Sequence, residues 1–354
     1  MKKAIIALSG GVDSSVAALF MKENGYDCIG VTMKLYDNDD IGVSREKTCC
    51  SLDDIEDARS VAHKLDMPYY VFNFKDEFEE KVIKNFIETY EQGGTPNPCI
   101  QCNRYLKFEK LMHRMQELKY DYVVTGHYAD IEYKNGRYLL KKGADASKDQ
   151  SYVLYSLTQY QLEHTIFPLG KFSKEEIREI AEKNGFINAK KRDSQDICFV
   201  PDGDYAKFIE NYCNKTYPRG EFVDKNGNVL GEHNGIIRYT IGQRKGLNIA
   251  LGHPVYVISK DIEHNRVVLG TNEDLNTNEL YAEDFNWIIE KPQNYIECSA
   301  KTRYNMKEVP CTAYCENDLV KVVFDLPVRA VTEGQAVVLY DGDYVLGGGK
   351  IVQK

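Results

Sequence analysis

The segment ALSGGVDSS at residues 7–15 lies between a strand-like run, KAIIAL, and a helix-like run, SSVAALFMKENG. Gly10 and Gly11 allow the backbone to turn tightly and to present its N–H groups, and the neighbouring serines add hydroxyl donors. The start of the helix contributes a partial positive charge at the same place. The segment therefore predicts a phosphate-binding turn between the first strand and the first helix.

This turn matches neither of the two common nucleotide motifs. No Gly-Lys-Ser/Thr follows the glycines, as a Walker A loop requires, and the spacing is not that of G-x-G-x-x-G. A plainer alternative is a glycine turn capped by serine at a strand–helix junction. The turn alone leaves both interpretations open.

Strand-like and helix-like segments alternate through the N-terminal part of the chain. Buried-strand patterns cover 3–8, 27–33 and 68–74, with a further strand inside 121–133, and helical patterns cover 14–25, 53–65, 75–94 and 103–118. Such alternation is typical of βαβ units. We therefore expect an α/β fold over residues 1–205, with a doubly wound parallel sheet and helices on both faces.

After residue 205 the pattern changes to short β-like runs separated by turn signals such as DKNG, EHNR and YDGD. We expect a small mixed domain over residues 206–275. Strand patterns recur at 320–326 and 335–340. These indicate a β-barrel-like domain over residues 280–354.

The composition is that of a globular protein with an acidic balance. Hydrophobic residues make up 43% of the chain, charged residues 28%, and the net charge is -9. That charge disfavours indiscriminate binding of nucleic acids but leaves room for a local basic face. No apolar run approaches the ~18 residues of a membrane span, and the run after the N-terminal lysines is too short for a signal peptide. We expect a cytoplasmic protein.

Cys99 and Cys102 stand three positions apart in a Gly/Pro-rich loop just ahead of the helical pattern at 103–118. Such a pair can be a redox couple, half of a metal site, or a nucleophile beside a bystander. Ten cysteines spread through 354 residues favour reduced thiols over a disulfide framework. For the adjacent Cys49 and Cys50, incidental thiols in a helix-capping loop are favoured over a further metal ligand or sulfur relay.

The glycine turn resembles the PP-loop of ATP pyrophosphatases, which cleave ATP between the α and β phosphates and attach AMP to an oxygen of the acceptor. Further segments narrow the resemblance: TPNPCIQCNRYLKF, VTGHYA, KDQSYVLYSL, SQDICFV, GQRKGL and TRY. In this order along the chain, they are similar to the tRNA-uridine 2-sulfurtransferase (tRNA-specific 2-thiouridylase) family. The resemblance implies an enzyme that thiolates C2 of the wobble uridine of tRNA, with ATP and Mg²⁺ as cofactors.

Two other functions use some of the same features. An adenylating ligase or amidotransferase would use the turn but not the cysteines. A non-enzymatic RNA-binding module would use the C-x-x-C as a metal knuckle but not the turn.

The resemblance also assigns an ATP site, in which AMP transferred to O2 of uridine makes that oxygen a leaving group. Backbone amides of the turn would stabilise the departing pyrophosphate. Asp13 is expected to contact Mg²⁺. The ATP-lining residues are Ala7, Leu8, Ser9, Gly10, Gly11, Val12, Asp13, Ser14, Met33 and Gly126.

The resemblance also assigns the sulfur chemistry to Cys102 and Cys198. Cys198 would carry a persulfide, whose outer sulfur is a strong nucleophile, and Cys102 would release the transferred sulfur by forming a disulfide with Cys198. Cys99 departs from the family, in which aspartate is common at this place. With it, Cys99, Cys102 and Cys198 could hold a [4Fe–4S] cluster that delivers sulfide, whereas zinc would need a fourth ligand. Cluster, persulfide and zinc all stay open.

Contacts with RNA are implied by the resemblance as well. The target base would touch Asn97, Pro98 and Cys99, and the tRNA would touch His127, Lys148, Asp149, Gln150, Arg303, Tyr304 and Gln335. Further basic candidates are Lys141, Lys142, Lys190, Lys191, Arg192, Arg238, Arg244 and Lys245. Any of these can equally be a solvated surface charge, and His127 a satisfied loop histidine.

Two further expectations concern partners and movement. The sulfur donor would be a cysteine desulfurase, a relay protein or sulfide. The loop at 37–51 is expected to close over the site as a lid.

Overall fold

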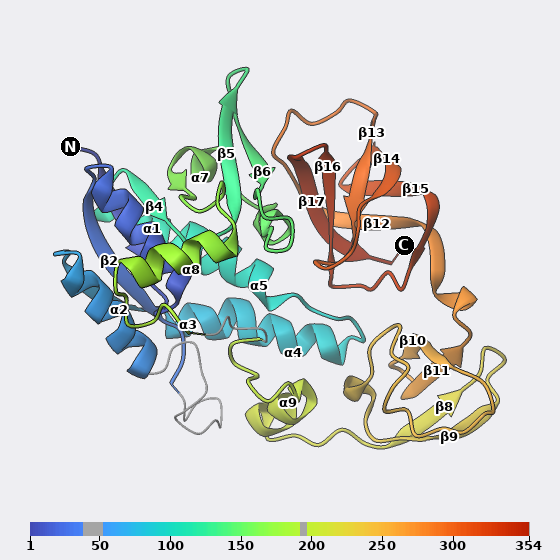
Figure 1. Ribbon diagram of the computed structural model, residues 1–354. Helices are drawn as coiled ribbons and strands as arrows, with labels where there is room; N and C mark the ends of the chain where they lie inside the picture. Colours follow the sequence, from blue (N-terminus) through green and yellow to red (C-terminus); the bar gives the residue numbers. More distant parts are fainter. Residues whose placement is uncertain (38–51, 192–196, 354) are drawn as a thin grey trace.

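The structure is a computed structural model that describes residues 1–37, 52–191 and 197–353. Figure 1 shows a helix-covered sheet at the N-terminal end of the chain, a small β unit after it and a barrel at the C-terminal end. Within these residues, no helix has the length and apolar character needed to cross a membrane.

The N-terminal sheet is parallel and has the strand order β3-β2-β1-β4-β7. Successive side chains of β1 face opposite sides, so Ala4 and Ile6 join one hydrophobic cluster and Ile5 joins the other. The expected doubly wound α/β fold is confirmed. The strands are β1 Lys3–Ala7, β2 Asp27–Lys34, β3 Tyr69–Asn73, β4 Tyr122–Val124 and β7 Thr165–Ile166.

Helices cover both faces of this sheet (Figure 1). The face of Ala4 and Ile6 carries α1 Val12–Glu23, α2 Leu52–Lys64 and α8 Lys174–Lys183. The other face carries one continuous helix of α3 Lys75–Phe78, η1 Glu79–Ile83 and α4 Lys84–Glu91, and a second of α5 Pro98–Gln101, η2 Cys102–Lys110 and α6 Leu111–Glu117. Short helices η3 Ser151–Leu154 and α7 Gln159–Glu163 lead into β7.

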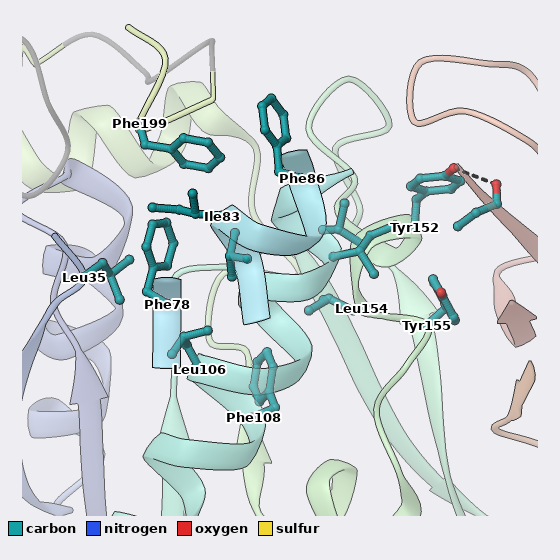
Figure 2. Packing of buried hydrophobic residues seen from close by; sticks show 14 of the residues in the cluster. Leu35, Phe78, Ile83, Phe86, Leu106, Phe108, Tyr152, Leu154, Tyr155 and Phe199 are labelled. Carbon is teal, nitrogen blue, oxygen red and sulfur yellow. Dashed lines mark hydrogen bonds between the residues drawn. The ribbon is translucent and has the colours of Figure 1, made fainter. Parts of the chain in front are cut away.

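Aromatic rings fill the core on this second face (Figure 2). Phe199 packs edge to face against Phe78 and Phe86, with ring centroids 5.6 and 5.1 Å away. Such pairs contribute about 0.5–1.5 kcal/mol beyond the burial of their area. Because Phe199 directly follows Cys198, this packing anchors that cysteine against the helix α3–α4.

The central unit is a small mixed sheet with the order β10-β11-β8-β9, as expected. Strands β11 and β8 are parallel, and the other neighbours are antiparallel. Its elements are α9 Tyr205–Cys213, β8 Gly220–Val223, β9 Val229–His233, η4 Ile236–Arg238, β10 Tyr256–Asp261 and β11 Arg266–Gly270.

The C-terminal unit is a closed antiparallel barrel, which confirms the expected β-barrel-like domain. Strand β12 pairs with both β15 and β17, which closes the order β12-β15-β14-β13-β16-β17. After η5 Glu273–Leu275, its strands are β12 Asn276–Trp287, β13 Tyr295–Lys301, β14 Val309–Glu316, β15 Leu319–Arg329, β16 Ala336–Asp341 and β17 Tyr344–Val352.

A hairpin from the N-terminal part joins this barrel. Strands β5 Ala129–Lys134 and β6 Arg137–Lys142 pair with each other, and β6 continues the barrel sheet through Lys141 opposite Tyr344. The sequence pattern predicted a strand in this region but not its partner. The domain boundaries at 205 and 280 stay predictions.

Candidate active site

The glycine–serine turn lies at the carboxyl end of β1, where α1 begins. Among the described residues no side chain caps this helix start, so its first N–H groups face the turn. The hydroxyls of Ser14 and Ser15 donate to the carbonyl of Gly11 at 3.1 and 2.9 Å. The turn therefore has the open helix start and ordered serines that a phosphate site requires.

Two residues that the sequence analysis did not assign to this site hold the turn from behind. The Asn188 amide donates to the carbonyl of Gly10 and to the Ser15 hydroxyl, both at 2.9 Å. Lys191, a predicted RNA contact, donates to Asp54 and Asp57 of α2 at 2.6 Å and to the carbonyl of Gly10 at 3.3 Å, so it ties the turn to α2. These contacts join positions more than a hundred residues apart, and no local motif signals them.

Gly126 lies directly against the turn, at the end of β4. A methyl group at this position would lie 2.8 Å from the backbone carbon of Asp13 and 2.8 Å from the backbone nitrogen of Ser14. In the order β3-β2-β1-β4-β7 the strand order reverses between β1 and β4, which is where doubly wound sheets bind their ligands. The structure thus brings two predicted ATP-lining segments together at this edge.

Asp13 does not fit the expected Mg²⁺ contact. Both of its carboxylate oxygens accept hydrogen bonds of 2.8 Å from the Lys174 ammonium, and the Tyr128 hydroxyl donates to one of them at 2.7 Å. Lys174 is 7% exposed. These bonds hold the turn against α8, which carries Lys174. Removal of Asp13 would leave the buried ammonium of Lys174 without its carboxylate partner.

Cys99 and Cys102 lie on a helix and not in the loop that the sequence analysis expected. The helix begins at Pro98 because Asn97 caps it by accepting from the backbone N–H of Ile100 at 3.4 Å. Proline suits the first helical position, since its fixed backbone angle is already helical. Cys99 is exposed and Cys102 is partly buried.

The π-helical segment η2 begins at Cys102 and also contains Lys107. In a π-helix hydrogen bonds run between residues five apart, so Lys107 lies one turn along from Cys102. Burial raises the pKa of the Cys102 thiol to about 11, and the charge of Lys107 opposes this rise. Lys107 is a residue that the sequence analysis did not single out.

His127 is buried beside this lysine. Its Nε2 lies 3.5 Å from the Lys107 ammonium and its Nδ1 lies 2.6 Å from the Thr125 hydroxyl. The ring packs against Phe108 and Phe167. Burial, helped by the charge of Lys107, holds the pKa of His127 well below its usual range. The alternative of a satisfied loop histidine fits these contacts better than a surface contact with RNA.

The neutral His127 gives a pH test. Because the unfolded chain binds a proton at His127 below pH ~6.5 and the folded chain does not, the stability present above that pH is lost as the pH falls. Acidification from pH 7.5 to 5.5 should therefore cost wild type about 1.4 kcal/mol more of its free energy of unfolding than His127→Gln.

Urea unfolding at the two pH values measures this difference. His113→Gln, at a side chain that is 65% exposed, is the control for the replacement of a histidine by glutamine. Equal pH dependence of wild type and His127→Gln would contradict the buried neutral histidine.

Cys198 lies in a turn beside the same aromatic core. Its carbonyl accepts a hydrogen bond of 2.9 Å from the Tyr36 hydroxyl. Its side chain packs against the hydrophobic cluster that contains Phe199. Within the described ranges, no group of three or more His, Cys, Asp or Glu side chains is placed to hold a metal ion. Among these residues, Cys99, Cys102 and Cys198 are thus not grouped as ligands of one metal ion, and the cluster and the zinc site stay predictions.

Several predicted RNA contacts have structural partners. Asp149 accepts from the Ser151 hydroxyl at 2.9 Å, and Gln150 accepts from the backbone N–H of Tyr128 at 2.9 Å. One nitrogen of Arg303 donates to the carbonyls of Ala330 and Ile241 at 2.7 and 3.3 Å. Other ion pairs join Lys141 to Glu132, Lys142 to Glu308 and Arg238 to Glu210. The contacts Lys142–Glu308 and Arg303–Ile241 join different units of the molecule, and the others lie within one unit.

The remaining RNA candidates lie on the surface. Lys190, Arg244 and Lys245 are exposed, and Tyr304 is 36% exposed. Cys49, Cys50, Arg192 and residues 38–51 of the lid expected at 37–51 lie outside the described residues, as do residues 194–196 of the motif that contains Cys198.

Comparisons with known proteins cover nearly the whole chain. Residues 2–202 match the family model described as tRNA methyl transferase HUP domain, residues 206–271 match the tRNA methyl transferase PRC-barrel domain, and residues 277–351 match the aminomethyltransferase beta-barrel domain. The chain is 52% identical over 357 residues to the tRNA-specific 2-thiouridylase MnmA of Lachnoclostridium phytofermentans, with 100% of each chain covered. It is also 52% identical to the protein of that name in Clostridioides difficile, over 100% of this chain and 98% of that protein. This chain belongs to the tRNA-specific 2-thiouridylase family.

Proposed function

We propose that this protein uses ATP to replace the C2 oxygen of the wobble uridine of tRNA by sulfur. The observation that carries the proposal is the junction at residues 125–127. Gly126 lies against the phosphate turn, and the next residue, His127, contacts Lys107, one π-helical turn from Cys102. The proposed ATP site and the helix that carries Cys102 would thus both adjoin this short segment, as activation followed by sulfur transfer requires.

ATP would bind at the turn, and its use is supported by the family. The residues proposed to line the site are those of the turn, with Met33 from β2 and Gly126. N–H groups at the start of α1 would stabilise the charge of the departing pyrophosphate. Asp13, held by Lys174 and Tyr128, would keep the turn in place, and Mg²⁺ would have to be held by other groups.

Sulfur transfer would follow in two steps, attack on C2 and release of 2-thiouridine. The outer sulfur of a Cys198 persulfide attacks C2 and loses its proton to water, the C2–O bond breaks, and AMP leaves with the bonding electrons. The Cys102 thiolate then attacks the inner sulfur, which releases 2-thiouridine and leaves a Cys102–Cys198 disulfide. A dithiol reductant must reduce that disulfide before the next turnover.

The persulfide route is favoured over a [4Fe–4S] cluster by the placement of the cysteines. The described residues do not gather the thiolates of Cys99, Cys102 and Cys198 around one point. A cluster needs those ligands together. Cys99, exposed on the first turn of the helix, would instead face the target base together with the part-buried Asn97, whereas Pro98 is buried.

The RNA would lie across the exposed basic residues of the N-terminal and central units. Lys190, Arg244, Lys245 and the part-buried Lys148 are the proposed phosphate contacts, and Tyr304 offers an aromatic ring for stacking. The sulfur donor would be a desulfurase, a relay protein or sulfide. A tRNA substrate would place the protein in the cytoplasm.

The test incubates the whole protein with unmodified tRNA, ATP and a persulfide or sulfide source without oxygen, once iron-free and once after reconstitution with iron. We expect equal 2-thiouridine from both preparations, measured by mass spectrometry of digested tRNA. Product only after reconstitution with iron would indicate that Cys99, Cys102 and Cys198 hold a [4Fe–4S] cluster. AMP release without any thiolated base would instead indicate an adenylating ligase.

A further inference from the structure

The loop before the cysteine helix is held by the C-terminal barrel. The Gln335 amide nitrogen donates to the carbonyls of Thr95 and Pro96 at 3.0 and 3.2 Å. The backbone N–H of Thr95 in turn donates to the carbonyl of Glu333 at 2.8 Å. The turn between β15 and β16, here called the barrel turn (residues 330–335), therefore lies next to the residues that start the helix at Pro98.

Close packing reinforces these hydrogen bonds. A methyl group on Gly334 would lie 2.6 Å from the Thr89 side chain and 3.1 Å from the carbonyl of Thr95. One on Gly94 would lie 3.0 Å from the carbonyl of Glu333. The two backbones approach this closely only because both positions are glycine.

The central unit holds the other end of the same loop. Glu91 accepts hydrogen bonds from Lys215 at 2.6 Å and from the Tyr217 hydroxyl at 2.5 Å. A methyl group on Gly93 would lie 3.1 Å from the Ile262 side chain. The central unit and the barrel therefore both contact the loop at 91–96. These contacts fix the position at which the helix of Cys99 and Cys102 begins.

The hydrogen bonds of Gln335 leave its side chain without an N–H donor for an RNA phosphate. A side-chain amide has two N–H donors, and its oxygen is an acceptor. Thr95 and Pro96 engage both donors. A phosphate oxygen accepts hydrogen bonds and does not donate them, so the amide oxygen of Gln335 is no partner for it.

We propose that Gln335 is a positioning residue, which fixes the Thr95–Pro96 carbonyls and thereby the helix start that presents Cys102 to the base. This inference rests on the proposed function. It differs from the contact with tRNA that the family resemblance implied for Gln335. The barrel turn contributes to catalysis by holding the thiol-bearing helix, without touching the reacting atoms.

The experiment replaces Gln335 by methionine, which keeps the length of the side chain and removes both donors. We expect kcat for thiolation to fall about tenfold or more, because small displacements of a reacting group are costly, while the Kd for tRNA stays within about twofold of wild type. Gln116→Met is the matched control, since the Gln116 amide donates to the hydroxyl of the exposed Tyr160 and not to the loop at 91–96. Gln335→Lys restores donors to the two carbonyls and should recover part of the lost kcat.

A second readout needs neither RNA nor activity. Iodoacetamide labelling of Cys102, followed by mass spectrometry of its peptide, should be several times faster in Gln335→Met than in wild type. A contact with RNA cannot affect this rate when RNA is absent. The labelling also remains measurable if wild type forms no 2-thiouridine, in which case the proposed function fails and this inference is judged separately.

Two outcomes would overturn the inference. One is a weaker tRNA Kd with kcat and the labelling rate of Cys102 unchanged, which would make Gln335 a contact with RNA. The other is wild-type behaviour of Gln335→Met in all three measurements. Gln335→Leu, which also removes both donors, provides the same comparison of kcat and labelling if the methionine variant does not fold.

Discussion

Replacing Cys102 by serine should abolish 2-thiouridine formation while Cys198 still accepts a persulfide. A hydroxyl is a far poorer nucleophile than a thiolate toward a disulfide sulfur, so the base stays attached to Cys198 through its sulfur. We expect multiple-turnover thiolation to fall by roughly three orders of magnitude or more. Mass spectrometry of the protein should find Cys198 joined to the modified nucleoside.

Cys198→Ser should lose thiolation as completely, but for an earlier reason. It has no thiol to carry the persulfide, so no adduct with the base forms, and activated tRNA or free AMP accumulates. Cys213→Ser is the control, because Cys213 is exposed at the end of α9 and has no part in the proposed reaction. Full activity of Cys102→Ser would remove this thiol from the mechanism.

Replacing Gly126 by alanine should produce the second large effect, on ATP. The added methyl group would lie 2.8 Å from the backbone of Asp13 and Ser14, closer than side-chain carbons approach backbone atoms. Either the turn or the end of β4 must move, and overpacking of this kind costs about 1–3 kcal/mol of stability. We expect ATP to bind about tenfold more weakly or worse, since the N–H groups at the start of α1 move with Asp13 and Ser14.

Equilibrium binding of an ATP analogue and thermal unfolding measure the two parts of this effect. Gly231→Ala is the matched control, because its methyl group would lie 3.7 Å from Ile249, an ordinary contact. A Gly126→Ala protein with wild-type affinity for ATP would show that ATP does not use this edge of the sheet.

Local patterns predicted the elements that depend on neighbours in sequence. Strand–helix alternation predicted the parallel sheet, and the glycine–serine turn predicted the open start of α1, because both follow from residues within one β-α unit. The start of the cysteine helix was predicted too late, although Asn97 and Pro98 carry a local signal for it.

Contacts between distant segments could not be predicted in this way. Lys174 neutralises Asp13 from 161 residues further along, and Gln335 reaches Thr95 across 240 residues. A lysine or glutamine has no pattern that names its partner, so Asp13 was assigned to Mg²⁺ and Gln335 to RNA. The roles of single residues in the reaction stay predictions, and their contacts with distant segments could not be read from the sequence.

The pairing of β6 with the barrel strand β17 has a consequence for biosynthesis. Lys141 leaves the ribosome about two hundred residues before Tyr344, its partner in the sheet. At roughly 5–20 residues per second, the nascent N-terminal part carries an unpaired strand edge for about 10–40 s. Such an edge pairs readily with another chain. During synthesis, the β5–β6 hairpin that later joins the barrel therefore has a strand edge that a chaperone would protect.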